Sequence, residues 1–208
     1  MYAICLIISA TGYAQVTEVA HWNFDEGSGT NISDGQGSNT GTLFNPGANA
    51  WISGYSGGAI DFTQKADPDT SCLVSVPHDA SISFNDTESF TIVTVAKVND
   101  PTAAAGETSL WGKGVPSSNP DGWYHLSFKN NALRFMVWDG SNLASPAGDL
   151  NGEIVADEWA QIVCVRDVAS DSLLVYVNGV LLDKSEDITT GDISTVGDLH
   201  TGISPESN

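Results

Sequence analysis

Short runs of alternating apolar and polar residues follow one another along most of the chain, separated by clusters of Gly, Asn, Asp, Pro and Ser. Alternation with a period of two predicts β-strands, and such clusters are typical of turns. Asn178 and Gly179 stand between two of these runs and supply the two positive-φ positions of a tight hairpin. We therefore predict an all-β protein. The expected strands cover residues 19–24, 40–44, 58–62, 72–76, 89–98, 109–113, 123–128, 133–138, 159–166, 173–178, 180–183 and 194–201.

The run 90–97 has two largely apolar faces. Phe90, Ile92, Thr94 and Ala96 share one face, and the intervening residues, two of which are valines, share the other. A strand coated on both sides is expected near the centre of a sheet, with a second sheet over one face and a loop or a ligand over the other. Residues 141–157 lack such a pattern, so a loop over one rim is expected there.

The first fourteen residues differ from the rest of the chain. Residues 3–10 form an apolar run, and Gly12 and Ala14 place small residues at the two positions that a signal peptidase reads. We therefore expect residues 1–14 to be a signal peptide cleaved before Gln15. The run is too short to span a bilayer. No Lys or Arg follows Met1, so the start of the signal is read as truncated, and a first strand or a short anchor is the alternative.

The composition restricts the partners. The chain has 208 residues, enough for one large domain, with 7 Lys and Arg against 26 Asp and Glu and a net charge of −19. Such a surface repels phosphate backbones and anionic membranes, so we expect no nucleic acid and no membrane insertion. Cys72 and Cys164 lie in apolar runs and are expected either as two buried thiols or as a disulfide.

The order of several motifs is more specific than any one of them. They are HWNFDEGSGT at 21–30, DGQGSNTG at 34–41, GGAIDF at 57–62, VSVP at 74–77, SFTI at 89–92 and LVYVNG at 174–179, with Trp159 opening a strand that ends at Arg166. In this order they resemble the secreted bacterial laminin-G-like domains of the concanavalin A-like lectin/glucanase superfamily. The resemblance covers residues 19–203.

The resemblance implies a two-sheet antiparallel jelly-roll sandwich with loops clustered at its rims. It also implies one more strand, which members of the family have near the C-terminus and which this chain does not reach by Asn208. We therefore interpret residues 15–208 as one laminin-G-like jelly-roll domain, C-terminally incomplete, within a larger secreted or cell-surface protein.

The sequence offers no convincing catalytic constellation. Related laminarinase-type glucanases carry alternating carboxylates on one strand, and the nearest candidate here is Glu153 with Asp157 and Glu158. The last two are adjacent, so they would point to opposite sides of a strand. The four His residues lie at no metal-ligand spacing, and no Gly-x-Ser-x-Gly elbow occurs. We expect no enzymatic activity.

Aromatic residues give one candidate ligand site. Sugars bind through apolar faces stacked on aromatic rings together with a few polar groups. The expected ligand-binding residues lie in consecutive strands or at their ends: Trp111, Trp123, Tyr124, Trp138 and Asp139. The alternative for each ring is a place in the core, which at their family positions is the expectation for Trp22 and Trp159.

The acidic N-terminal loops suggest one calcium ion. Asp34 and Asn39 provide side-chain oxygens at the two ends of a segment with two glycines, and Asp25 is a weaker third ligand. Related folds carry one calcium at the rim of the sandwich, which favours this hypothesis. The alternative is a solvated turn in which Asp34 caps its own backbone.

Taken with the resemblance, these features indicate a non-catalytic extracellular module that binds a polysaccharide, a cell-surface glycan or another surface ligand and is monomeric within a larger chain. Two alternatives stay open. One is a structural spacer or a protein-interaction or adhesion domain, and the other is a glycan-active hydrolase or lyase. Fold alone does not decide among them.

Overall fold

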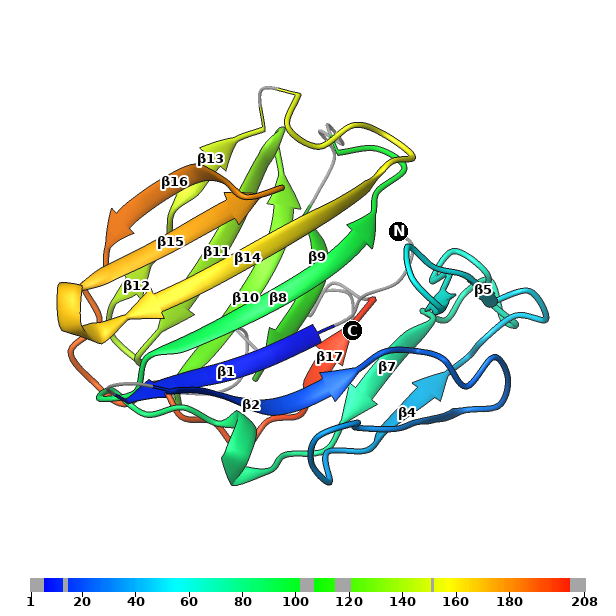
Figure 1. The fold of residues 1–208 in the computed structure, drawn as a ribbon, viewed down its shortest axis with the longest axis horizontal. Helices are drawn as coiled ribbons and strands as arrows, with labels where there is room; N and C mark the ends of the chain where they lie inside the picture. The colour runs from blue at the N-terminus through cyan, green and yellow to red at the C-terminus, as the bar shows by residue number, and fades with distance from the viewer. Residues whose placement is uncertain (1–5, 13–14, 102–106, 115–120, 151, 203–208) are drawn as a thin grey trace.

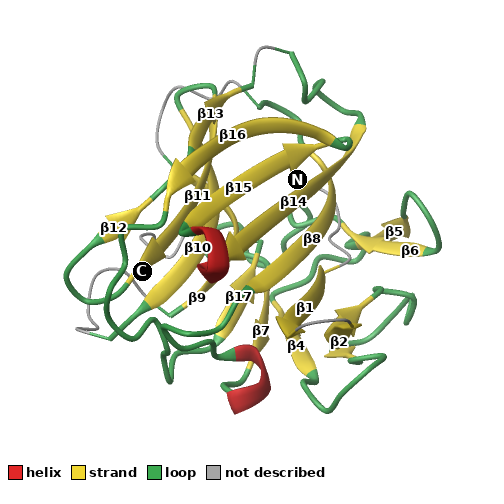
Figure 2. Ribbon diagram, turned by 60° about the vertical axis from the view of Figure 1, so that its left-hand side comes forward, coloured by secondary structure: helices red, strands yellow, loops and turns green. Residues whose placement is uncertain are grey.

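The computed structural model describes residues 6–12, 15–101, 107–114, 121–150 and 152–202. Two large antiparallel sheets pack face to face, and a small two-stranded sheet lies beside them (Figure 1). The helical turns among the described residues are two one-turn 3₁₀ helices, η1 (Ala80–Ile82) and η2 (Val168–Ser170), drawn in red in Figure 2. The predicted two-sheet antiparallel sandwich is confirmed.

The first sheet has six strands in the order β16-β15-β14-β8-β1-β2. Their bounds in chain order are β1 (Leu6–Gly12), β2 (Gln15–Trp22), β8 (Phe90–Lys97), β14 (Trp159–Asp167), β15 (Ser172–Val177) and β16 (Val180–Glu186).

The second sheet has nine strands in the order β12-β11-β10-β9-β17-β7-β4-β3, with β13 also paired to β11. Their bounds are β3 (Asn31–Ile32), β4 (Gly41–Phe44), β7 (Leu73–Val76), β9 (Thr108–Lys113), β10 (Trp123–Lys129), β11 (Ala132–Trp138), β12 (Leu143–Ala144), β13 (Ala147–Asp149) and β17 (Leu199–Thr201). The two-stranded sheet pairs β5 (Trp51–Ser53) with β6 (Gly58–Ile60).

Each of the twelve expected strands overlaps an observed one, because alternation reports directly which side chains face the core. The single loop expected at 141–157 is corrected, since it contains the short strands β12 and β13 on the flank of β11. The segment 194–201 was expected to be one strand, but only Leu199–Thr201 pairs with its neighbours.

The central strand β8 follows the predicted division into two faces. Residues alternate strictly between buried and half-buried, with Phe90, Ile92, Thr94 and Ala96 on the core side. β8 pairs with β14 on one side and with β1 on the other. The predicted hairpin is also present, since Asn178 and Gly179 adopt φ values of 49° and 82° between β15 and β16.

The core between the sheets is dense in aromatic rings. Phe90 of β8 stacks on Phe84 with centroids 4.5 Å apart and contacts Tyr124 of β10 at 5.1 Å. Trp111 of β9 lies 6.3 Å from Tyr124, and its indole N–H donates to the Thr94 hydroxyl at 2.9 Å. Because Trp111, Tyr124 and Phe90 are at most 1% exposed, they link the two sheets rather than face solvent. Cys72 and Cys164 are also buried, and both are free thiols.

The N-terminal segment lies inside the first sheet. Residues Leu6–Ala10 pair with β8, and the whole of β1 pairs with β2. A first strand was the alternative to the signal peptide in this part of the sequence. Cleavage before Gln15, and with it the assignment of residues 1–14 as a signal peptide, stays a prediction.

A buried arginine binds the segments 85–88 and 187–189 at one end of the first sheet. Arg166 of β14 is 2% exposed and its Nε donates to the Asp187 carboxylate at 2.7 Å. Its other guanidinium nitrogens donate to the carbonyls of residues 85, 86 and 88 and to the Thr189 hydroxyl. Removing one partner of such a pair typically costs about 3–5 kcal/mol, because the other charge stays buried.

Removal of residues 1–14 tests the role of β1. Without β1, both β2 and β8 lose a hydrogen-bonded neighbour, and unpaired edges favour association with other chains. We expect residues 15–208, expressed alone, to self-associate and to melt at a lower temperature than the whole chain. Size-exclusion chromatography with light scattering and thermal melts measure both effects, and a monodisperse, heat-stable monomer contradicts the prediction.

Candidate ligand-binding site

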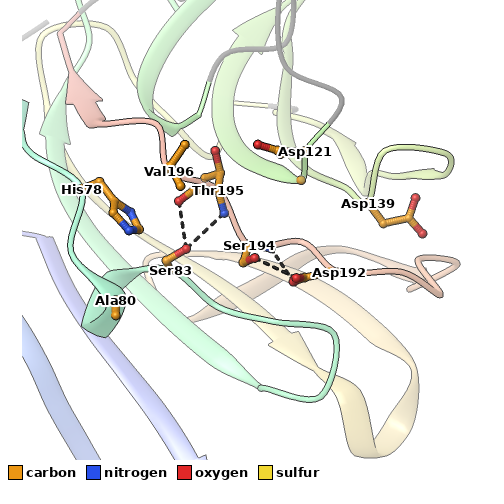
Figure 3. A pocket seen from close by; sticks show the side chains of 10 residues that line it. His78, Ala80, Ser83, Asp121, Asp139, Asp192, Ser194, Thr195 and Val196 are labelled. Carbon is orange, nitrogen blue, oxygen red and sulfur yellow. Dashed lines mark hydrogen bonds between the residues drawn. The ribbon is translucent and has the colours of Figure 1, made fainter.

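A cavity of about 620 Å³ opens at the rim where the loops of the second sheet gather, a volume within the usual range for ligand sites. Three segments line it: the one around η1, the start of β10 with the end of β11, and the connection between β16 and β17. Figure 3 shows His78 and Ala80 on one wall, with Asp121 and Asp139 on the opposite wall. The lining residues are His78, Ala80, Ser83, Asp121, Gly122, Asp139, Asp192, Ser194, Thr195 and Val196.

The connecting segment 187–198 forms the third wall and is held along its length. The Thr195 N–H donates to the Ser83 hydroxyl at 3.1 Å, and the same hydroxyl donates to the Thr195 carbonyl at 3.0 Å. Ile193 is fully buried and lies directly against Gly122, where any Cβ would overlap the Ile193 backbone. Gly122 is therefore required for this close approach.

Asp139 ties the end of β11 to this segment. Its Oδ2 accepts the N–H groups of Thr190 and Gly191 at 2.8 and 3.0 Å. Its Oδ1 accepts the N–H groups of Ser141 and Asn142, and the Asn142 side chain adds a further donor to Oδ2. Burial alone would raise the pKa of Asp139, but the amide of Asn142 and the N–H groups of Asn142, Thr190 and Gly191 hold it well below the ordinary value.

A buried lysine supports the wall that carries His78. Lys113 is fully buried, its Nζ donates to the Gly197 carbonyl, and the same nitrogen lies 3.3 Å from Nδ1 of His78. Burial lowers the pKa of Lys113 to about 8, against the opposing effect of the Asp198 carboxylate. Asp198 also accepts the His78 N–H at 3.1 Å and the Ser75 hydroxyl at 3.1 Å. The cavity thus rests on a satisfied polar network.

The sequence-predicted aromatic residues divide into two groups. Trp111 and Tyr124 lie in the core, where the Tyr124 hydroxyl donates to the Ile82 carbonyl at 2.5 Å, so neither ring has a face to offer a ligand. Trp123 and Trp138 stack on each other, with centroids 6.4 Å apart, next to cavity residues Gly122 and Asp139. Trp138 is half-buried and Trp123 is 7% exposed. Of the five predicted residues, only Asp139 lines the cavity.

Most of the residues that line the cavity were not predicted from the sequence. Ser194, Thr195 and Val196 lie at the beginning of the strand expected at 194–201, Asp192 lies just before it, and nothing in the local sequence shows that this segment returns to η1. The dense run of Asp, Ser and Thr at 192–195 was the one signal of a loop.

The structure brings two of the three predicted calcium ligands together. Asp34 Oδ2 accepts both the N–H and the side-chain amide of Asn39 at 3.1 Å, and Oδ1 accepts the N–H groups of His21 and Gln36 at 2.9 and 3.0 Å. Burial alone would raise the pKa of Asp34, but these backbone donors hold it below the ordinary value. This arrangement matches the alternative of a carboxylate that caps its own turn.

Asp25, the third predicted ligand, makes a different contact, since its Oδ1 accepts the Gly58 N–H at 2.6 Å. Among the described residues, no three His, Cys, Asp or Glu side chains converge as a metal site would require. Calcium at the 34–39 loop stays a prediction.

The candidate catalytic residues remain apart from the cavity. Glu153, Asp157 and Glu158 lie in exposed turns, where Asp157 has φ of 61°. The Ser109 hydroxyl lies 2.7 Å from Nε2 of His125, but these side chains are only 2% and 4% exposed. Burial lowers the pKa of His125 to about 4, which leaves a neutral, hydrogen-bonded pair within the second sheet.

The sequence profile of the concanavalin A-like lectin/glucanases superfamily (Laminin_G_3) matches residues 68–207. The chain therefore belongs to this superfamily, as its two-sheet fold also indicates. No curated protein matches the sequence. No helix among the described residues is long and apolar enough to cross a membrane.

Three solved structures of similar fold are described as binding domains or in complex with a sugar. Domain 4 of AbnA, a GH43 extracellular arabinanase from Geobacillus stearothermophilus in complex with arabinotriose, is 18% identical with a TM-score of 0.60, over 89% of this chain and 82% of that one. The receptor-binding domain of botulinum neurotoxin D is 13% identical with a TM-score of 0.57, over 83% of this chain. The binding domain of Paraclostridial Mosquitocidal Protein 1 is 16% identical, with a TM-score of 0.54 over 96% of this chain. This chain spans only 41% and 44% of the two toxin domains.

Replacing Asp139 by Asn tests its role in holding the 187–198 segment. The variant cannot offer two charged oxygens to five donors, so we expect a loss of about 1–3 kcal/mol in unfolding free energy at neutral pH. Because the folded pKa is depressed, the contribution is complete above the ordinary carboxyl pKa and is lost as pH falls through the lower folded value. The difference between wild type and variant should therefore shrink below about pH 4.

Urea titrations at neutral and acidic pH measure this difference. Asp183→Asn is the matched control, because the Asp183 carboxylate accepts the Ala147 N–H but makes no contact with the 187–198 segment that we describe. Equal losses for the two variants at every pH contradict the assigned role.

Thermal melts with excess calcium or chelator test the metal prediction. If calcium binds at Asp34 and Asn39, it raises the melting temperature of the wild type by mass action, and Asp34→Ala removes the rise. The same substitution lowers stability in chelator as well, because four N–H bonds lose their acceptor. An identical calcium response of the two proteins excludes an ion at this loop.

Proposed function

We propose that this chain is a non-catalytic, extracellular carbohydrate-binding module of a larger secreted protein and that the 620 Å³ cavity binds the sugar. The observation that carries the proposal is the lining of this cavity, which combines three carboxylates and three hydroxyls with an exposed valine. Val196 is 71% exposed and supplies an apolar surface among them.

A neutral sugar suits this lining chemically. Carboxylates only accept hydrogen bonds and sugar hydroxyls donate them, so the carboxylates of Asp121 and Asp192 suit a sugar, whereas the Asp139 oxygens already accept five donors of the protein. Asp121 and Asp192 are exposed at the mouth, and the Asp192 carboxylate already orients the Ser194 hydroxyl at 2.8 Å. A few fixed polar groups in a rigid concave site are typical of small-molecule recognition.

The charge of the protein favours a neutral ligand over an acidic one. The net charge of −19 and the three carboxylates of the cavity repel uronates and sulfated sugars. No Lys or Arg is among the described residues that line the cavity, so no permanent positive charge lines it to offset that repulsion.

The similar structures support a binding role rather than catalysis. The arabinanase domain is named with a bound trisaccharide, and the toxin domains are named for receptor binding. At 10–20% identity these likenesses concern the fold, so the ligand class proposed here rests on the cavity itself.

Isothermal titration with neutral trisaccharides, among them arabinotriose and laminaritriose, tests the proposal, with alginate as the polyanionic comparison. We expect binding of at least one neutral sugar and none of alginate. Asp121→Ala should weaken binding about tenfold by removing one hydrogen-bonding group at the mouth. Val180→Ala, an exposed position of the β15–β16 hairpin, is the control and should bind as the wild type does.

Three outcomes would contradict the proposed function. Chelator-insensitive binding of alginate alone contradicts a neutral ligand. Release of reducing sugar favours a glycan-active enzyme. Absence of glycan binding across the panel favours a structural or protein-interaction domain.

A further inference from the structure

A second cavity, of about 360 Å³, lies on the solvent side of the first sheet and draws its residues from three separate parts of the chain. β2 and the residues after it form one side, the β5–β6 hairpin forms another, and β8 with the start of β14 forms the floor. None of its residues lines the first cavity. The lining consists of His21, Asn23, Asp25, Tyr55, Ser56, Gly58, Val95 and Trp159.

Tyr55 is 74% exposed at the tip of the β5–β6 hairpin, the largest exposure among the large hydrophobic residues described. Its hairpin is nevertheless fixed in place. The Gly58 N–H donates to Asp25 at 2.6 Å, and a Cβ on Gly58 would overlap the Phe24 carbonyl. The backbone that carries the exposed ring is therefore held beside the cavity and has little conformational entropy to lose on binding.

Trp159 provides the second aromatic surface. It was expected in the core, but it is half-buried and lines this cavity. Lys97 lies opposite it across the β8–β14 ladder, with Nζ 5.4 Å from the centroid of the indole ring. This cation–π contact favours the observed orientation of the ring.

The polar residues are placed around these two rings. Phe24 turns its side chain into the core with φ of 58°, so that Asn23 and Asp25 on either side of it are both exposed. Positive φ is uncommon for an aromatic residue and costs strain, which the surrounding packing must hold. The side-chain oxygen Oδ1 of Asn23 accepts the Asp25 N–H at 3.2 Å, which orients the Asn23 amide next to the carboxylate.

We propose that this second cavity binds one unit of a neutral saccharide, with Tyr55 and Trp159 as aromatic platforms and Asn23, Asp25 and Ser56 as hydrogen-bonding partners. Two aromatic surfaces with an amide, a carboxylate and a hydroxyl match a ligand that has apolar faces and many hydroxyls. The volume lies within the range of small-molecule sites and is smaller than that of the first cavity, which suits a single unit. The inference does not depend on the first cavity.

NMR of the ¹⁵N-labelled indole nitrogens follows ligand binding at each cavity separately. Six tryptophans give six indole signals; Trp159→Phe assigns the reporter of the second cavity, and Trp138→Phe assigns a reporter next to the first. Titration with arabinotriose, cellotriose, laminaritriose, mannotriose and N-acetylchitotriose should shift the Trp159 signal with at least one of them. Tyr55→Ala should weaken that response about tenfold, whereas Tyr55→Phe, which keeps the ring, should weaken it less than about threefold.

Tyr55→Ala removes an exposed side chain, so its melting temperature should equal that of the wild type, and Val180→Ala is the control for a surface truncation outside both cavities. A Trp159 signal that no trisaccharide moves at millimolar concentration overturns the proposal, as does a shift that Tyr55→Ala leaves unchanged. If only the Trp138 signal responds, the second site fails and the function proposed for the first cavity stands. If only the Trp159 signal responds, the reverse holds.

Discussion

The buried guanidinium of Arg166 is the interaction on which the geometry of the rim around the first cavity depends. It lies at the end of β14, pairs with Asp187 and binds three carbonyls of the 85–88 turn. That turn leads into β8, and Asp187 begins the segment that forms a wall of the first cavity. One side chain thus fixes the entry to the central strand and the start of the cavity wall. Because the ion pair is desolvated, its main effect is specificity: any arrangement that separates the partners leaves a buried charge.

From Arg166 onward the wall is held by contacts that are individually ordinary. Thr189 donates to Asp187, Thr190 and Gly191 donate to Asp139, Ile193 fills a place against Gly122, and Thr195 exchanges bonds with Ser83. None of these residues needs a ligand to complete its bonding. A wall that is already ordered loses little conformational entropy when it binds, which favours a rigid binding site over an induced one.

The strands could be predicted from the sequence, whereas the cavities could not, and the reason is the range of the forces involved. The alternation of apolar and polar residues along 90–97 and 173–183 depends only on which side chains of each strand face the core. The strands, the two faces of β8 and the Asn178-Gly179 turn were therefore predicted correctly. Trp123 and Tyr124 are adjacent aromatic residues of one strand and both are buried, but Tyr124 lies in the core between the sheets and Trp123 stacks on Trp138 beside the first cavity. Which of the two enters the core is set by register, and register depends on partners far away in the chain.

The same limit applies to the carboxylates. Asp34 and Asp139 each have a sequence context that suits a ligand, yet both oxygens of each accept N–H groups up to 52 residues distant, and Oδ1 of Asp25 accepts the Gly58 N–H. A carboxylate at a loop therefore has two competing uses, capping backbone donors or meeting a ligand, and only the folded geometry decides between them.

The linings of the two cavities differ in chemistry. The first is rich in acceptors and poor in aromatic surface, and the second has two rings and few charges. Both lie on a molecule whose net charge is −19, so the electrostatic field excludes anionic chains before either lining is reached. A polymer long enough to reach both cavities would bind the second one intramolecularly, at an effective concentration set by the length of chain between them. Two sites that each bind a short oligosaccharide weakly would then hold an extended neutral polymer more tightly than its fragments.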